Sequence, residues 1–376
     1  MKNKWVVWVG IAFSFTSVPL FSQNESLSLK KVNQVDFSHI SIKDNFWSPR
    51  LEKHLSATLP VCIDQIENKT GRIQNFERAA KGRGEHSGIF FDDSDVYKAM
   101  EGMAYALANA RDAKLEAKLD EWIDKIAACQ QPDGYINTFY TLTGLQNRWT
   151  DMDKHEMYCA GHMIEAGVAY SQATGKRKLM DVGIRMAEHC MSLFDVGKGH
   201  WVPGHEEIEL ALLKLWEHTE KLEYLKLARY FINLRGNNEK DMPLSERFDL
   251  TYNQSHEPVR DMREAVGHAV RAEYLYCAMA DLARIDNDEE LKGICKTIFN
   301  DIALKKMYIT GGVGSGIIGE CFTEEYDLPN QFSYQETCAG IGLALLAKRM
   351  NLLSFSFNSY YLITNMWCKV ILLRYF

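Results

Sequence analysis

The sequence lacks several features that would assign it quickly to a class of protein. Its nine cysteines, at positions 62, 129, 159, 190, 277, 295, 321, 338 and 368, form no C-x-x-C pair and no regular framework. An odd number of cysteines argues against complete disulfide pairing. No basic patch stands out and the formal net charge is −7, so we do not expect a nucleic-acid partner. With 46% apolar and 25% charged residues, the composition is typical of a globular protein with a sizeable core.

The N-terminus, residues 1–22, has the pattern of a secretory signal peptide. Two lysines precede an apolar run of about 17 residues, and Ser22 then offers a small-residue cleavage point. A single transmembrane anchor is the alternative, but the run is short and has no basic stop-transfer flank. We expect a cleaved signal of bacterial type, no stable membrane insertion after its removal, and a periplasmic or secreted protein.

Strand-like alternation is scarce, and from about residue 50 onward apolar residues recur at spacings of three and four. Several predicted helices come in pairs joined by short turns, and this pattern is typical of helical hairpins wound into an α/α barrel or an α-solenoid. We therefore predict an all-α fold over about residues 50–350, with the choice between barrel and solenoid open at this point. The predicted helices are 50–67, 94–111, 115–130, 156–174, 177–194, 206–219, 222–235, 262–284, 288–304 and 334–350.

The stretch 311–350 holds the densest set of groups that could do chemistry. Glu320 follows a glycine-rich run, and Glu336 and Cys338 stand two residues apart at the start of a predicted helix. A carboxylate and a thiol at this spacing can reach one metal ion, and Zn²⁺ accepts both oxygen and sulfur donors. A second carboxylate that is not bound to the metal would be free for proton transfer. Spacing alone does not distinguish this site from a chance pair.

Three histidines stand at or near predicted helix starts: His155, His205 and His268. A lone histidine is more often structural, but three that recur at one rim of a barrel could converge on a central pocket. There, neutral imidazoles could donate to or accept from sugar hydroxyls. No H-E-x-x-H motif is present, so the histidines do not predict a zinc triad.

A set of motifs spread over residues 38–350 resembles glycoside hydrolase family 127, the β-L-arabinofuranosidase family formerly called DUF1680. In chain order the motifs are FWSPR, DSDVYKAMEG, QPDGYINT, HEMYCAGHMIEAGVA, GHEEIELALLKL, EPVRDMREAVGHAVRAEYL, and GECFTEEYDLPN followed by YQETCA. The resemblance implies an (α/α)6 barrel, also described as a six-hairpin glycosidase, that acts on plant oligosaccharides or cell-wall glycans. It also implies Glu320 as the general acid/base, Glu336 and Cys338 as zinc ligands, and the three histidines as the lining of the sugar pocket.

The chain departs from the family pattern near its C-terminus. The family's nucleophile belongs to a Cys-Cys-Pro pair about 80 residues after the E-T-C motif, whereas these 376 residues contain no adjacent cysteines. Two of the four expected zinc ligands are then missing, so we expect weakened zinc binding. Residues 351–376 are aromatic and apolar and contain no Asp or Glu. We expect them to be an aberrant tail, explained by a frameshift, with a genuine apolar helix or strand as the alternative.

Three functional hypotheses remain open from the sequence. The first is a retaining β-L-arabinofuranosidase-like enzyme with Glu320 as acid/base. The second is a catalytically inactive, truncated or frameshifted relative that keeps only a sugar-binding barrel and lacks the β-sandwich of the family. The third is a different α/α-barrel carbohydrate enzyme that uses paired aspartates, for which Asp92, Asp93 and Asp95 are the candidates. The sugar, its linkage and the oligomeric state do not follow from the sequence.

Overall fold

The computed structural model describes residues 34–194, 201–237 and 249–353. These ranges are helical and contain no β-strand; the only ladder-type pairing among them is a single antiparallel bridge between His268 and Cys321. The helices are α1 (Trp47–Lys53), α2 (Leu59–Asp64), α3 (Arg72–Ala80), α4 (Asp93–Asn109), α5 (Ala113–Cys129), α6 (Thr138–Thr143), α7 (Glu156–Thr174), α8 (Lys178–Leu193), α9 (Ile208–Thr219), α10 (Leu222–Leu234), α11 (Ala269–Asp286), α12 (Glu289–Asp301) and α13 (Thr337–Leu353).

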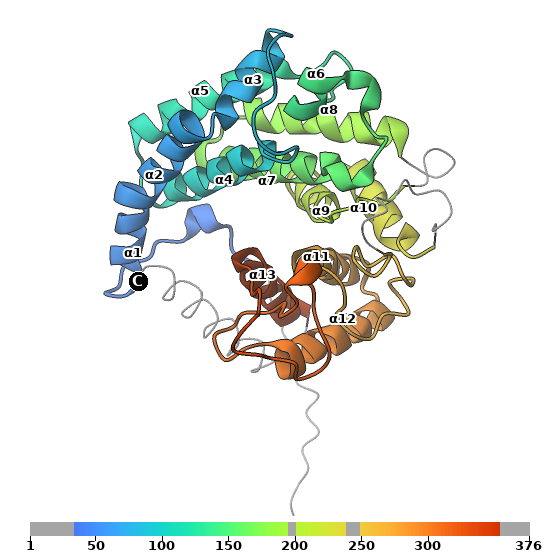
Figure 1. Ribbon diagram of the computed structural model, residues 1–376. Helices are drawn as coiled ribbons and strands as arrows, with labels where there is room; N and C mark the ends of the chain where they lie inside the picture. Colours follow the sequence, from blue (N-terminus) through green and yellow to red (C-terminus); the bar gives the residue numbers. More distant parts are fainter. Residues whose placement is uncertain (1–33, 195–200, 238–248, 354–376) are drawn as a thin grey trace, which may run out of the picture. The chain divides into compact units, whose positions relative to one another are not determined.

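Inner and outer helices alternate along the chain. The inner helices contact one another in sequence order, α4 with α7, α7 with α9, α9 with α11 and α11 with α13. Each of α7, α9 and α11 also packs on the helix that follows it, namely α8, α10 and α12. Figure 1 shows these pairs side by side, with α8 and α12 on the outside of α7 and α11. This alternation is that of an (α/α)6 barrel, which confirms the predicted fold class.

The distribution of apolar and charged residues around each helix explains which helices lie inside. α7 and α11 are buried on nearly every side, because their sequences are rich in alanine and other small or apolar residues all the way round. In contrast, α8, α10 and α12 bury one face and carry charged residues on the other, the amphipathic pattern of a helix at a surface. The large buried side chains form one continuous core that includes Trp122, Tyr97 and Phe231.

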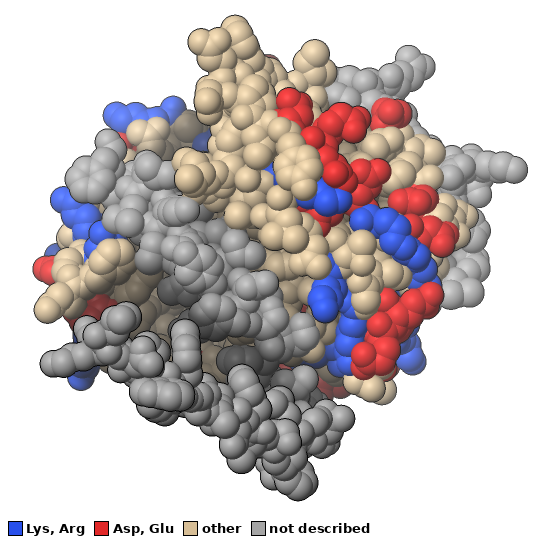
Figure 2. All heavy atoms as spheres, turned by 90° about the horizontal axis from the view of Figure 1, so that it is seen from below, with Lys and Arg blue, Asp and Glu red and all other residues tan. Residues whose placement is uncertain are grey.

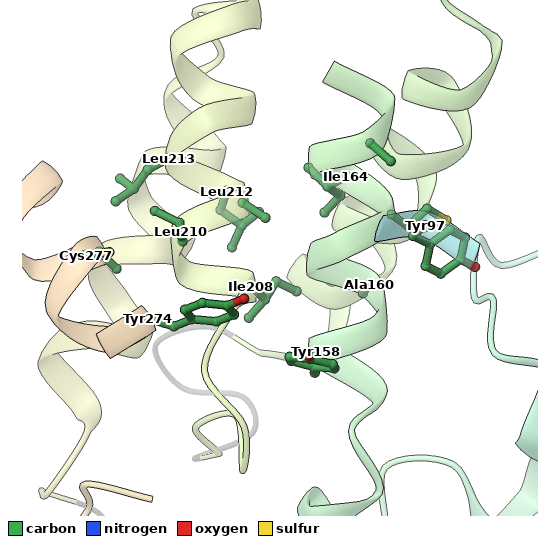
Figure 3. Packing of buried hydrophobic residues seen from close by; sticks show 14 of the residues in the cluster. Tyr97, Tyr158, Ala160, Ile164, Ile208, Leu210, Leu212, Leu213, Tyr274 and Cys277 are labelled. Atoms are coloured by element: carbon green, nitrogen blue, oxygen red, sulfur yellow. The ribbon is translucent and has the colours of Figure 1, made fainter. Parts of the chain in front are cut away.

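The hairpin arrangement brings the starts of the inner helices together. Each outer helix returns the chain to the end at which the preceding inner helix began, so successive inner helices run in the same direction. In Figure 3, Tyr158 and Tyr274 extend from α7 and α11 toward a common space beside Ile208, the first residue of α9. Side chains at helix starts that are far apart in sequence therefore meet at one end of the barrel.

Most helices match the predicted ranges, and α7 matches at both ends. The range 262–284 is wrong at its start, because α11 begins only at Ala269. Gly267 has a φ of +72°, and a Cβ at this position would lie 2.0 Å from the Thr251 carbonyl oxygen, so the chain turns here instead of continuing a helix. The short helices α3 and α6 were not predicted, and α13 continues to Leu353, beyond the predicted boundary at 350.

The predicted signal peptide and residues 354–376 of the predicted tail lie outside the described residues. Within the part of the chain that the structure describes, no helix combines the length and apolar character that a membrane crossing requires. Figure 2 shows one face of the molecule, where acidic and basic side chains lie next to one another over part of the described surface, mainly on the right of the view.

Candidate active site

The backbone around His268 holds the Glu320 loop in place. The Gly267 carbonyl accepts a hydrogen bond from the Phe322 N–H at 2.9 Å, and the His268 N–H donates to the Tyr252 carbonyl at 3.1 Å. Glu320 ends a short 3-10 turn with a φ of 54°, a left-handed conformation that is uncommon outside glycine. The loop thereby turns the Glu320 carboxylate back toward the start of α11.

His155 lies at the start of α7 in an aromatic setting. Its ring stacks on Phe91 with centroids 5.0 Å apart and lies 5.2 Å from the ring of His205. Nδ1 donates to the Asp153 carbonyl at 2.5 Å. Burial, helped by the nearby positive charge of Arg271, holds the His155 pKa well below its usual range. The ring is therefore neutral, with Nε2 able to accept a hydrogen bond.

His205 repeats this arrangement from the loop before α9. Nδ1 donates to the Glu206 carbonyl at 2.9 Å, and burial again holds the His205 pKa well below its usual range, with Arg271 adding to the effect. Its ring lies 5.2 Å from His155 and 5.6 Å from His268. The three histidines that the sequence singled out therefore lie in a row, while their role in sugar binding stays a prediction.

His268 is the N-cap of α11 and connects this row to Glu320. Its Nδ1 accepts from the Arg271 backbone N–H, so Nε2 carries the proton and donates to Glu320 Oε2 at 3.0 Å. The hydrogen bond from His268 is the main reason why the Glu320 pKa lies below its usual range, and a hydrogen bond from Tyr334 acts in the same direction. With His268 and Tyr334 both donating to it, Glu320 is held as a carboxylate, and it is 38% exposed.

Glu336 and Cys338 flank the first residue of α13. Single donor atoms of His268, Glu320 and Glu336 all lie within 4.8 Å of one another, so these three residues could share a cation. The Cys338 thiol is not a member of that group. The pKa of Tyr334 rises to about 12 through burial, through its hydrogen bond to Glu320 and through the negative charge of that carboxylate.

The donor set at α13 suits a metal in chemical terms. Carboxylate oxygen and thiolate sulfur are both ligands that zinc accepts. A tetrahedral site needs four ligands, so Glu336 and Cys338 would supply half of the set. In the structure, the groups that could hold a metal at this end of the barrel are His268, Glu320 and Glu336, whereas zinc and its ligation by Cys338 stay predictions.

Three residues of this region were not predicted from the sequence. The Tyr158 ring centroid lies 4.2 Å from that of His205, and the Tyr274 centroid lies 6.0 Å from it, so the two tyrosines form an aromatic floor against the histidines. Arg271 donates to the Gly204 carbonyl and so holds the loop that carries His205. Tyr158 and Arg271 each follow a predicted histidine by three residues, a spacing that places both on the same helix face as that histidine.

The aspartates of the alternative hypothesis have structural partners. Asp92 and Asp95 both pair with Arg72, at 3.2 Å and 3.0 Å. Asp93 is buried and accepts hydrogen bonds from the Thr138 backbone N–H at 2.7 Å and from its hydroxyl. This pairing joins α4 to α6 and does not form a carboxylate pair facing a pocket.

Comparison with known proteins decides the family. Residues 39–360 match the model of the β-L-arabinofuranosidase GH127 catalytic domain. The chain belongs to glycoside hydrolase family 127. A curated relative, the non-reducing end β-L-arabinofuranosidase of Bifidobacterium longum subsp. longum, is 38% identical over 353 residues, which cover 83% of this chain and 53% of the relative.

Solved family 127 structures have the same fold. A GH127 β-L-arabinofuranosidase from Geobacillus stearothermophilus T6 superposes with a TM-score of 0.84 and 40% identity, over 88% of this chain and 55% of that one. A second GH127 β-arabinofuranosidase gives a TM-score of 0.83 and 37% identity, over 90% of this chain and 54% of the other. The present chain therefore spans about half the length of the relatives it matches.

Proposed function

We propose that this family 127 domain binds a non-reducing-end β-L-arabinofuranosyl residue, or a related sugar of plant glycans, and takes part in its hydrolysis with retention of configuration. The observation that carries the proposal is the hydrogen bond between His268 and Glu320 at the end of the row His155–His205–His268. It places a partly exposed carboxylate beside three imidazoles, over an aromatic floor.

The proposed roles follow from the protonation states. His155 and His205 are neutral, with Nδ1 committed to backbone carbonyls, so Nε2 of each can accept from a sugar hydroxyl. Glu320 would act as the acid that protonates the leaving oxygen and then as the base that activates water. His268 and Tyr334 favour the carboxylate form, so Glu320 gains its proton when substrate displaces one of these donors.

Zinc and a thiolate nucleophile complete the proposal. Glu336 and Cys338 would hold zinc, and bound zinc keeps coordinating thiols deprotonated near neutral pH. The nucleophile that the family resemblance implies belongs to an adjacent cysteine pair, and no two of the nine cysteines are adjacent. A second candidate function is a barrel that binds the sugar without cleaving it, because His268 and Tyr334 hold Glu320 as a carboxylate, which has no proton to give to a leaving group.

One experiment separates the two functions. Hydrolysis of 4-nitrophenyl β-L-arabinofuranoside by the purified chain is compared with hydrolysis by Glu320→Gln, and L-arabinose binding is measured by calorimetry on the same samples. Loss of hydrolysis in Glu320→Gln with retained binding supports the glycosidase. Binding without hydrolysis, abolished by His205→Ala, supports the binding barrel. Neither binding nor hydrolysis in a folded sample would refute both.

A further inference from the structure

A second cluster of possible metal ligands lies in the interior of the barrel. His162 and Glu165 stand three residues apart on one face of α7, and Glu207 immediately precedes α9. One donor atom from each lies within 4.8 Å of the other two. His162 and Glu207 are buried, with relative exposures of 4% and 1%. None of the three has a part in the glycosidase site proposed above.

The polar atoms at the centre of this cluster have no hydrogen-bond partner among the described residues. This holds for both ring nitrogens of His162 and both carboxylate oxygens of Glu207. His162 Nδ1 lies 3.4 Å from Glu207 Oε1, close enough for an ion pair but without hydrogen-bond geometry. Leaving buried polar atoms unpaired is unfavourable, so a cluster of such atoms that face one another calls for a partner that satisfies them together.

Gly161 permits this close approach. A Cβ at position 161 would lie 2.6 Å from Glu207 Cγ and 3.0 Å from the Ile208 backbone nitrogen. Any side chain there would push the start of α9 away from α7. The glycine therefore lets the Glu207 carboxylate reach the face of α7 that carries His162 and Glu165.

The surrounding charges hold Glu165 in place and leave Glu207 without a cation. Lys214 pairs with Glu165 at 3.3 Å and with Glu101 at 3.0 Å, so the Lys214 ammonium group holds the Glu165 carboxylate in place. Lys98 donates to the Tyr158 hydroxyl at 2.6 Å. Among the described residues no lysine or arginine forms an ion pair with Glu207.

We propose that His162, Glu165 and Glu207 form a binding site for a divalent transition metal such as Zn²⁺, separate from Glu336 and Cys338. Imidazole nitrogen with two carboxylate oxygens is a donor set that zinc accepts, and it lacks the sulfur donor that Cys338 offers at the other site. The site lies next to the aromatic floor of the sugar pocket, since the His162 ring is 4.5 Å from Tyr158 and 6.1 Å from Tyr274.

The test counts metal ions in variants of the full chain. Glu336→Gln combined with Cys338→Ser removes the donors at α13, and the chelator-treated protein is then titrated with Zn²⁺ and analysed by mass spectrometry for bound metal. We expect this background to retain about one zinc ion per chain. Adding His162→Ala or Glu207→Gln should remove that ion, whereas the neighbouring buried substitution Glu206→Gln should leave it bound.

Two further readouts keep the outcome clear. Cobalt bound in the Glu336→Gln/Cys338→Ser background should show ligand-field bands without a thiolate-to-cobalt charge-transfer band. Zinc should raise the melting temperature of the background protein but not of its Glu207→Gln form, which preserves the shape of the side chain. A folded background protein that binds no zinc, or zinc that persists in both His162→Ala and Glu207→Gln, would overturn the proposal. Neither result depends on glycosidase activity.

Discussion

The buried Arg235 offers a quantitative test of how the fold supports the pocket. It is fully buried and donates to the Pro203 carbonyl at 2.9 Å and the Asn253 carbonyl at 2.7 Å. It also forms ion pairs with Glu206 at 2.9 Å and Glu209 at 3.1 Å. Burial raises the pKa of Glu206 to about 8, despite the opposing effect of Arg235. This cluster fixes the loop that leads into His205.

Arg235→Met should therefore be strongly destabilising. It leaves a buried carboxylate and two carbonyl oxygens without their partner, and breaking a buried pair in this way costs about 3–5 kcal/mol. The control is Arg229→Met, because Arg229 pairs with Asp286 on the surface, with side chains 35% and 32% exposed. An exposed pair of this kind contributes about 0–1 kcal/mol.

Urea denaturation followed by far-ultraviolet circular dichroism measures both variants. For an m-value of about 3 kcal/mol/M, the Arg235 variant should lose about 1 M or more in midpoint, and the Arg229 variant no more than about 0.3 M. Equal midpoints for the two variants would refute the reasoning, because burial would then make no difference to the pair. L-arabinose binding should weaken in Arg235→Met even under conditions where the protein is fully folded, since the His205 loop loses its support.

Three further predictions concern titration and metal binding. Burial raises the pKa of Asp93 from 3.8 to about 6, so the free energy of unfolding of the wild type falls as the pH rises through this window. Asp93→Asn should remove this pH dependence. In urea titrations, the stability of the variant relative to wild type should therefore improve by about 3 kcal/mol between about pH 4 and pH 7. His268→Leu removes the donor that lowers the Glu320 pKa, so that pKa should rise in a ¹³C NMR titration assigned with Glu320→Gln; an unchanged value would contradict the role of His268. Cys338→Ser should remove any thiolate-to-cobalt charge-transfer band from the cobalt-loaded protein, and a persisting band would exclude Cys338 as a ligand.

Sequence periodicity predicted the fold because inner and outer helices differ in pattern. The helix at 156–174 is apolar or small-residue rich on every side, and its outer neighbour α8 is amphipathic, so both elements and their turn could be recognised. The meeting of His155, His205 and His268 also followed from their positions at helix starts. Helices α3 and α6 are short, at 9 and 6 residues, and so give too few turns for a periodic signal.

The interior cluster was not visible from the sequence. Glu207 follows Glu206 in a run that reads as the acidic first turn of a surface helix, and only the packing of α9 on α7 places it against His162. The partners of Asp93 were equally hidden, since Thr138 lies 45 residues further along the chain. Local patterns identify helix starts, whereas contacts across the barrel depend on how closely two helices approach.

The common direction of the inner helices has a consequence for measuring folding. The proposed pocket takes His155 from α7, His205 from the approach to α9 and His268 from α11, so consecutive hairpins each supply one wall. If one hairpin detaches, the pocket loses a wall although the other hairpins keep their helices. Arabinose affinity would then report whether all three hairpins are docked at the same time. Circular dichroism measures only the total helical content, which hardly changes when one hairpin detaches with its helices intact.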